Sequence, residues 1–339
     1  MAETATQLVT LTRSNYPETY HWGWLVITAA DGSPVYCTPD APQKSCFWRS
    51  SAKPFQLLPL LQDFPDCDVS PEEVAVACAS HVASAYHLRV VENLLHKAGL
   101  AQAHLGCGAH MPMDNDEHRH LLCQGHSAEK KHNNCSGKHA AMLLHCVKRG
   151  WPIQNYLDAD HPLQQRIFEA VKTYTQCNNI GMATDGCGAP TYYAPLESFA
   201  NAFGKLGVAP EFETIRSAVK QHPVLIGGEG RVDTAIISAT DGTVISKVGA
   251  DGLLCATRAG SGEGLAIKIA DGSGEIRDKL ATALLIKLGW INATQAQHPA
   301  LAEFLDTNRV NTQGKVVGSM RFDFLENSVL ETYAPESLV

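Results

Sequence analysis

The feature that most constrains this chain is the placement of strand-like segments at both ends and helical segments between them. Runs rich in β-branched and aromatic residues lie at 21–30 and 34–38, joined by the turn Asp31-Gly32-Ser33. Similar runs return later, at 231–239, 243–250, 253–258, 264–270 and 315–324. Apolar residues recur at helical spacing in six segments: 54–63, 71–79, 86–98, 138–149, 161–175 and 192–206.

This order predicts an α+β fold in which one antiparallel sheet is built jointly by the two ends of the chain. We expect residues 1–60 and 225–339 to form the part that contains the sheet. Residues 61–224 are expected to form a mostly helical subdomain, with the active site between the two parts.

Charge and apolar patterning exclude several classes of function. The formal net charge is −8, and the lysines and arginines are scattered, so no basic surface for nucleic acid or an anionic membrane is predicted. The chain lacks a signal-peptide pattern and any apolar run near the ~18 residues of a membrane span. We therefore expect a soluble, unexported, cytoplasmic protein whose eleven dispersed cysteines are mostly reduced and buried.

The segment RSSAKPFQLLPLL, residues 49–61, carries the first candidate for catalysis. A helix that begins near Ser51 tolerates Pro54, because a first-turn amide has no partner within the helix. Ser50 and Lys53 then lie on one helical face, and burial or a second cation would favour a neutral amine able to take the serine proton. The free amides at the helix start could stabilise an oxyanion.

The Ser-x-x-Lys spacing alone does not decide the role of Ser50. Ser127 with Lys130 and Ser217 with Lys220 have the same spacing, in more charged surroundings. Ser50 is instead followed by an apolar helix. The alternative interpretation is a serine that caps the helix beside a surface lysine.

A second serine and a second lysine occur in unusual positions. Ser80 follows an apolar helical segment and precedes His81, and its alternative role is an ordinary residue at a helix end. Lys268 interrupts an otherwise apolar strand, where an inward-facing ammonium group is costly unless it is paired. Its alternative is a position that faces solvent.

Two cysteine-containing segments, 132–140 and 184–190, form the third candidate. Gly137-Lys138 lacks the upstream glycine and the following hydroxyl residue of a phosphate-binding loop, which excludes nucleotide binding there. Thiolates suit zinc, but no C-x-x-C pair is present, so the spacing indicates metal binding only weakly. Buried free cysteines are the alternative.

Taken together, these segments resemble the L-asparaginase II family, the Rhizobium-type asparaginases, over nearly the whole chain. The motifs that carry the resemblance are ETYHWG at 18–23, RSSAKPFQ at 49–56, CASH at 78–81, NNCSGKHAAML at 133–143, HPLQ at 161–164, DGCGAPTYYAPL at 185–196, HPVLIGG and GRVDT within 222–234, and GEGLAIKIADG at 262–272. The resemblance implies a fold similar to that of serine β-lactamases, penicillin-binding proteins and Ser-x-x-Lys glutaminases. It also implies a homodimer.

The function implied by the resemblance is hydrolysis of L-asparagine to L-aspartate and ammonia. Two serine–lysine pairs are implied, Ser50 with Lys53 and Ser80 with Lys268, together with a zinc ion near the substrate pocket. The implied zinc ligands are Cys135, Lys138 and Cys187. A lysine ligand must lose its proton, so zinc occupancy should fall on acidification.

Two further residues are candidates for substrate binding. Asp185 could accept a hydrogen bond from the substrate amino group or orient the metal site, and Arg49 could bind the substrate carboxylate or pair with an acidic neighbour. After His81 the chain reads Val82-Ala83-Ser84, where the family leads us to expect a glycine and an acidic residue.

Three other functions remain open at this stage. They are a glutaminase, a penicillin-recognising acyl hydrolase of the same fold, and a non-catalytic protein that binds zinc or an amino acid. Lys268 is followed by Ile-Ala instead of the K-T-G motif of penicillin-directed enzymes.

Overall fold

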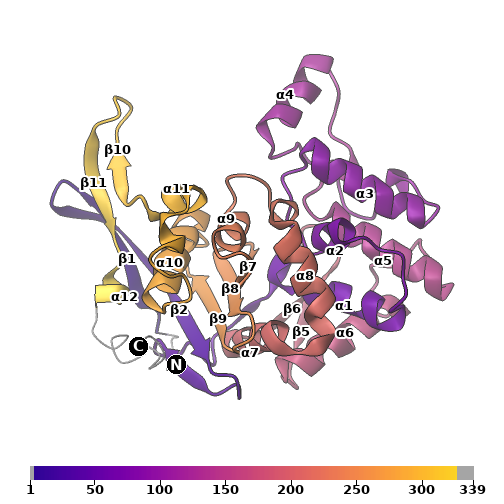
Figure 1. Ribbon diagram of the computed structural model, residues 1–339, viewed down its shortest axis with the longest axis horizontal. Helices are drawn as coiled ribbons and strands as arrows, with labels where there is room; N and C mark the ends of the chain where they lie inside the picture. The colour runs from indigo at the N-terminus through magenta and orange to yellow at the C-terminus, as the bar shows by residue number, and fades with distance from the viewer. Residues whose placement is uncertain (1–3, 327–339) are drawn as a thin grey trace. The chain divides into compact units, whose positions relative to one another are not determined.

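The computed structural model describes residues 4–326, and these form two compact units (Figure 1). The sheet unit comprises the chain up to Ser45, the segment Pro195–Gly207 and the chain from Ala235 onward. The helical unit comprises Cys46–Ala194 and Val208–Thr234. The architecture belongs to the α+β class, as predicted.

The sheet unit is built on an antiparallel sheet whose strand order is β10-β11-β1-β2-β9-β8-β7, with β3 paired to β2. The strands are β1 Thr6–Arg13, β2 Tyr16–Thr28, β3 Pro34–Cys37, β7 Val244–Gly249, β8 Leu253–Arg258, β9 Gly264–Ile269, β10 Asn308–Val310 and β11 Val316–Arg321. Its helices are α7 Leu196–Val208, α10 Gly274–Lys287, α11 Ala302–Leu305 and α12 Asp323–Glu326, and α9 Val232–Ala239 belongs to it from Ala235 onward. N-terminal and C-terminal strands share this sheet, which confirms the predicted pairing of the two ends.

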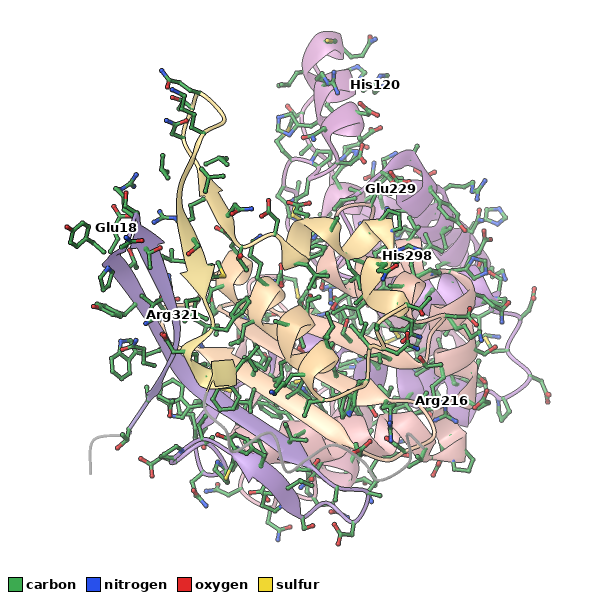
Figure 2. The ribbon with its side chains drawn as sticks, turned by 60° about the vertical axis from the view of Figure 1, so that its left-hand side comes forward. Glu18, His120, Arg216, Glu229, His298 and Arg321 are labelled. Atoms are coloured by element: carbon green, nitrogen blue, oxygen red, sulfur yellow. The ribbon has the colours of Figure 1, made fainter. Side chains whose placement is uncertain are left out.

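The long strand β2 holds the sheet unit together. Its first part pairs with β1, and its second part pairs with β3 and β9. Leu25 and Ile27 from this second part are fully buried, and α10 packs on β8 and β9. At the other end of the hairpin, the exposed Glu18 (Figure 2) forms ion pairs with Arg13 and Arg309.

The helical unit contains α1 Lys53–Asp63, α2 Pro71–Ala77, α3 Ala85–Lys97, α4 Asn115–Gln124, α5 Ser136–Arg149, α6 Pro162–Thr175 and α8 Glu213–Gln221. A second, small sheet has the order β4-β6-β5, formed by β4 Ser45–Phe47, β6 Pro190–Pro195 and β5 Gly181–Thr184. Helix α5 packs against α1, α2, α3 and α6. It approaches α2 closely because Gly137 has no side chain: a Cβ there would lie 2.2 Å from the carbonyl oxygen of Val76.

Two of the predicted elements are wrong in type or extent. Residues 231–239 were predicted as a strand, but Val232–Ala239 is helix α9. Every residue of this helix except Ser238 is buried, and a short buried run of apolar and β-branched residues fits a helix as well as a strand. The helix predicted at 192–206 begins only at Leu196, because Pro190–Pro195 is strand β6.

A buried carboxylate fixes the end of α1 to α5 and α6. Asp63 accepts hydrogen bonds from His145 (2.9 Å) and Arg149 (3.2 Å), and Arg166 lies 3.2 Å from its other oxygen. Burial alone would raise the pKa of Asp63, but hydrogen bonds from Arg149 and His145 and the charge of Arg166 lower it below its ordinary value.

We expect Asp63→Asn to lower the free energy of unfolding by about 1–3 kcal/mol at pH 7. The carboxylate is stabilising above its unfolded pKa of ~3.9, and this contribution is lost as the pH falls through its lower folded pKa. The difference from the wild type should therefore shrink below about pH 4. Urea unfolding across this pH range tests it, with the exposed Asp116→Asn as control; equal stability of Asp63→Asn and wild type at pH 7 would contradict it.

Candidate active site

The first candidate serine lies in a strained turn that leads directly into α1. Arg49 has φ +50°, a left-handed conformation that is uncommon outside glycine, and Arg49–Ala52 form a 3₁₀ turn. Pro54 occupies the first turn of α1, as predicted. The Arg49 amide donates to Thr191 Oγ1 at 3.2 Å, which helps to hold the strained residue. Ser50 is half-buried within this turn.

The Lys53 amine is buried and bonded to the second candidate serine. It donates to Ser80 Oγ at 3.0 Å, to the carbonyl oxygen of Ala79, and to the carbonyl oxygen of Asn134 at 3.4 Å. Its side chain is only 1% exposed. Among the described residues, Ser50 is not a hydrogen-bond partner of this amine. The helical spacing of Ser50 and Lys53 did not predict the contact with Ser80, which depends on how two distant segments pack.

Ser80 lies in an extended segment that is fixed by its backbone. The amides of Ser80 and Val82 donate to the carbonyl oxygens of Ile226 and Gly227, both at 2.9 Å. The Ser80 side chain is buried. Ala83 has φ +63°, a conformation that glycine adopts without the clash of a Cβ. This strain falls in the segment where we expected a glycine.

His81 fastens the Ser80 segment to the start of α5. Its Nδ1 accepts from the Ala83 amide at 3.1 Å, so Nε2 carries the proton and donates to Ser136 Oγ at 2.9 Å. The Ser136 hydroxyl in turn donates to the Lys131 carbonyl oxygen at 2.8 Å. Burial lowers the pKa of His81 well below its ordinary value, so the ring stays neutral. Sequence reasoning gave His81 no role, and its position next to Ser80 was the only signal.

The three residues predicted to bind zinc lie together in the helical unit. Lys138 Nζ lies 3.1 Å from Cys187 Sγ, and Cys135 lies beside Cys187. All three side chains are at most 5% exposed. Cys135 precedes the first residue of α5, Lys138 lies one turn further on, and Cys187 follows β5 in a glycine-rich turn.

Cys135 and Lys138 each shift the pKa of the other towards its charged form. Burial alone would lower the pKa of Lys138, but Cys187 and Cys135 raise it above its ordinary value. The hydrogen bond from Cys187, helped by the charges of Lys53 and Lys138, lowers the pKa of Cys135 well below its ordinary value despite burial. These neighbours thus favour loss of the proton from Cys135 and its retention on Lys138.

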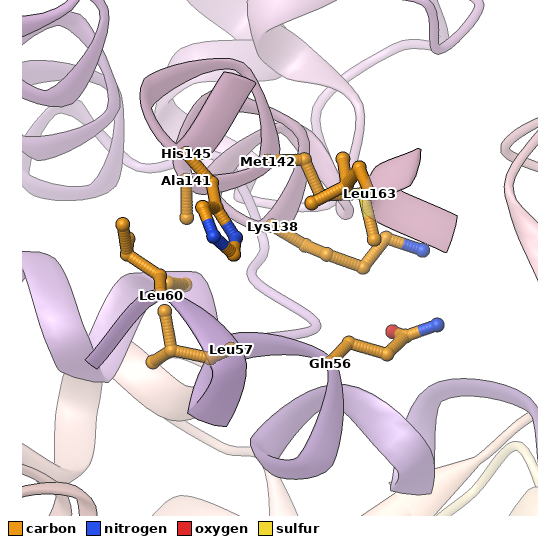
Figure 3. Close-up of a pocket in the computed structure, with 9 residues that line it drawn as sticks. Gln56, Leu57, Leu60, Lys138, Ala141, Met142, His145 and Leu163 are labelled. Atoms are coloured by element: carbon orange, nitrogen blue, oxygen red, sulfur yellow. The ribbon is translucent and has the colours of Figure 1, made fainter. Parts of the chain in front are cut away.

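The two sulfurs of this cluster are of the kind that zinc prefers, and the Lys138 amine offers a nitrogen. Within residues 4–326, no group of three or more His, Cys, Asp or Glu side chains is arranged to hold a metal ion. A zinc ion here would therefore need the Lys138 amine as a third donor, and that amine, whose pKa is raised by the two cysteines, would first have to lose its proton. Lys138 and Gln56 line a small, mostly apolar cavity (Figure 3). The centre of a water molecule could occupy only about 10 Å³ of it.

Arg49 and Asp185, the two candidate substrate-binding residues, form an ion pair. Arg49 Nε donates to Asp185 Oδ1 at 2.7 Å, and the amide of Gly186 donates to the same oxygen at 2.9 Å. Although burial opposes it, the charges of Lys138 and Arg49 lower the pKa of Asp185. Of the two roles expected for Arg49, the acidic neighbour is the one seen here. The pair also borders the cysteine cluster, because Cys187 Sγ lies 3.9 Å from Asp185 Oδ2.

Lys268, the remaining predicted residue, lies on β9 in the sheet unit. It stands opposite Trp24 on β2 and Leu253 on β8, and its amine donates to the carbonyl oxygens of Asp251 (2.7 Å) and Ile269 (2.6 Å). The pairing of Lys268 with Ser80 stays a prediction.

Sequence comparison identifies the family of this chain. The family model described as L-asparaginase II matches residues 9–322 of the 339. No curated protein matches the chain. Among the described residues, no helix has the length and apolar character needed to cross a membrane. Since the match extends over nearly the whole sequence, the chain belongs to the L-asparaginase II family.

Proposed function

We propose that this protein hydrolyses the side-chain amide of L-asparagine, giving L-aspartate and ammonia through a serine ester. Membership of the L-asparaginase II family supports an asparaginase-type hydrolase. The observation that carries the Ser/Lys mechanism is the buried hydrogen bond between Lys53 Nζ and Ser80 Oγ. This bond joins an amine and a hydroxyl that can exchange a proton. Lys53 also follows the other candidate serine, Ser50, by three residues in the sequence.

In the proposed mechanism, Ser50 Oγ attacks the amide carbon and a neutral lysine amine takes its proton. The amides at the start of α1 stabilise the oxyanion that forms. Collapse of the tetrahedral intermediate breaks the C–N bond, and the proton reaches the departing ammonia through Ser80. Water then hydrolyses the ester. Lys268 is proposed to act with Ser80 as the second pair.

Substrate binding is proposed for the ion pair beside the cysteine cluster. Asp185 is held as a carboxylate and so is able to accept a hydrogen bond from the substrate α-ammonium group. Arg49 carries the complementary charge for the α-carboxylate. Arg49 directly precedes the proposed nucleophile Ser50 in the sequence.

Zinc is proposed as the cofactor, with Cys135, Lys138 and Cys187 as its ligands. A bound zinc ion would supply a fixed positive charge and hold α5 to the turn after β5. The Ser/Lys pair already provides a nucleophile, so water activation by metal is not required. Removal of zinc should therefore change substrate affinity more than turnover; normal affinity without turnover in the chelated enzyme would contradict this role.

Zinc content tests the ligand set separately from activity. We expect about one zinc per chain in the wild type after dialysis, and loss of that zinc in Cys135→Ser and in Cys187→Ser, because each lacks one thiolate ligand. Elemental analysis by mass spectrometry measures the ratio. Cys146→Ser, a buried cysteine on the same helix, is the matched control and should retain the metal. Retention of zinc by the double variant Cys135→Ser/Cys187→Ser would overturn the proposed site.

Ammonia release from L-asparagine, L-glutamine and a chromogenic β-lactam tests the reaction itself. We expect release from L-asparagine. Glutamine differs by one methylene, worth about 1–3 kcal/mol of discrimination, so the ratio of the two rates must be measured. Activity only toward glutamine or the β-lactam would favour the related acyl hydrolases. No reaction with any of them, with zinc supplied, would favour a non-catalytic binding protein.

We further infer that the fold is of the serine β-lactamase/glutaminase-like kind and that the protein is a homodimer. The α+β architecture and the antiparallel sheet shared by both ends of the chain support the first of these inferences. The second comes from the family resemblance. Sedimentation of the purified protein measures its oligomeric state.

A further inference from the structure

The segment that carries Ser80 turns sharply before α3, and one buried residue makes this turn. Ala83 is fully buried and has φ +63°, a conformation that crowds the Cβ of an L-residue against its own backbone. The angle φ of Ala83 sets the direction in which Ser80 and Val82 extend from the start of α3 at Ala85. A relaxation of Ala83 to negative φ would therefore displace Ser80.

The side chain of His81 holds Ala83 in this conformation. Its Nδ1 accepts a hydrogen bond from the Ala83 amide, two residues further on, at 3.1 Å, which closes a small turn around the strained position. The other ring nitrogen, Nε2, donates to Ser136 Oγ at 2.9 Å. The ring thus joins the strained residue to the start of α5, which lies 55 residues further along the chain.

A second buried histidine supports the ring of His81. The rings of His81 and His87 are stacked, with their centroids 5.1 Å apart and their planes at 19°. His87 Nε2 donates to the Val224 carbonyl oxygen at 3.1 Å, so its Nδ1 accepts from the Ser84 hydroxyl at 2.7 Å. Because His87 is held at both nitrogens, the stacked ring of His81 has little freedom to turn away from Ala83.

The same segment is attached to the candidate base. The carbonyl oxygen of Asn134 accepts from the Lys53 amine at 3.4 Å and from the His81 amide at 3.2 Å. Lys53 Nζ also donates to Ser80 Oγ at 3.0 Å. A shift of the segment at His81 would therefore change the contact between the amine and the serine hydroxyl.

We propose that His81 is a positioning residue: by holding Ala83 in its left-handed conformation, it keeps Ser80 Oγ within hydrogen-bonding distance of the Lys53 amine. The inference rests on the proposed function, in which Ser80 passes a proton to the departing ammonia. His81 itself takes no part in bond making or breaking, so its effect on the reaction passes through Ser80.

Steady-state ammonia release from L-asparagine tests the proposal with two replacements of His81. His81→Ala removes the acceptor of the Ala83 amide, and we expect kcat to fall about 10²-fold, the effect of a small misplacement of a reacting group, with KM changed much less. His81→Asn offers a side-chain oxygen that can accept the same amide, so kcat should stay within about 5-fold of the wild type. A loss in His81→Asn as large as that in His81→Ala would contradict the role of this bond.

Replacement of Ala83 by glycine separates positioning from a merely structural role. Glycine adopts positive φ without the cost that alanine bears, so the turn no longer depends on His81. In the Ala83→Gly background, His81→Ala should therefore lower kcat by only about 10-fold instead of about 10²-fold. An equal loss in the two backgrounds would overturn the proposal.

His161 provides a matched control elsewhere in the helical unit. It is also buried, its Nδ1 accepts from the amide of Leu163, two residues further on, at 3.1 Å, and its Nε2 donates to the Pro152 carbonyl oxygen at 2.9 Å. Leu163 is a helical residue of α6, so no strained turn is held there. His161→Ala should lower thermal stability but retain kcat. A comparable loss of kcat in His161→Ala, or a folded His81→Ala with wild-type kcat, would overturn the proposal.

Hydrogen exchange of the peptide that contains residues 79–84 keeps this inference separable from the proposed function, because it needs no substrate. We expect exchange at least about 10-fold faster in His81→Ala than in the wild type, His81→Asn or His161→Ala. A wild type that shows this pattern but releases no ammonia would refute the proposed function and still support the hold of His81 on Ala83. An active wild type whose exchange and kcat are unchanged by His81→Ala would refute only this inference.

Discussion

Replacement of Ser50 by alanine is expected to lower kcat for ammonia release from L-asparagine by about 10⁴-fold or more. Without the hydroxyl no ester can form, and the remaining residues can only orient water and substrate. Substrate affinity should change little, because the lost group makes its decisive contact in the transition state. Steady-state kinetics with ammonia detection measures both quantities.

The chain itself provides a matched control for this experiment. Ser217 and Lys220 have the same Ser-x-x-Lys spacing on α8, where the half-buried Ser217 hydroxyl accepts only a local bond from Gln221 among those described. Ser217→Ala should retain full activity. Ser80→Ala should lose about 10²–10⁴-fold, the range of a lost proton-transfer group. If Ser80→Ala were inactive while Ser50→Ala retained turnover, Ser80 would be the nucleophile.

Lys53→Met is the second substitution for which a large effect is expected, a decrease in kcat of about 10²–10⁴-fold. Methionine keeps much of the buried volume of lysine but offers no amine to take the serine proton. Because Lys53 and Ser80 are joined by a hydrogen bond, their effects should not add: Lys53→Met/Ser80→Ala should be hardly worse than the more damaging single variant.

Loss of structure must be separated from loss of chemistry in this variant. The Lys53 amine satisfies the carbonyl oxygens of Ala79 and Asn134, so its removal also leaves buried acceptors without a partner. Thermal unfolding of each variant is therefore measured beside its kinetics. A folded Lys53→Met enzyme with wild-type kcat would rule out this lysine as the base.

Sequence patterns predicted the local elements of this fold better than the contacts between them. The apolar period of α1, α5 and α6 and the strand runs of β7, β8, β9 and β11 were found because each pattern is contained within its own element. Helix α9 was mistaken for a strand because a short buried run of apolar and β-branched residues fits either element. Helix α10 was not predicted, although most of its buried residues recur at helical spacing.

The candidate site shows the same limit at the level of single residues. Helical spacing predicted that Lys53 reaches Ser50, whereas the amine is bonded to Ser80, 27 residues further along the chain. Cys187 comes to Lys138 from 49 residues away, a separation that no local metal-binding pattern contains. The proposal that Cys135, Lys138 and Cys187 bind zinc came from the family resemblance alone. Spacing could not have revealed them, because tertiary packing brings them together.

The strand order of the sheet unit also determines when that unit can be completed as the chain is made. Strand β1 lies between β2 and β11, and Thr12 bonds to Ser319, 307 residues further on. At about 5–20 residues per second, a ribosome releases β11 roughly 15–60 seconds after β1. All of Cys46–Thr234 is synthesised before β7 to β11. During that interval β1 and β2 can form a hairpin, but the edges that later bind β11 and β9 stay open to other chains. The sheet unit therefore forms correctly only if elongation is faster than the pairing of these open edges with another chain.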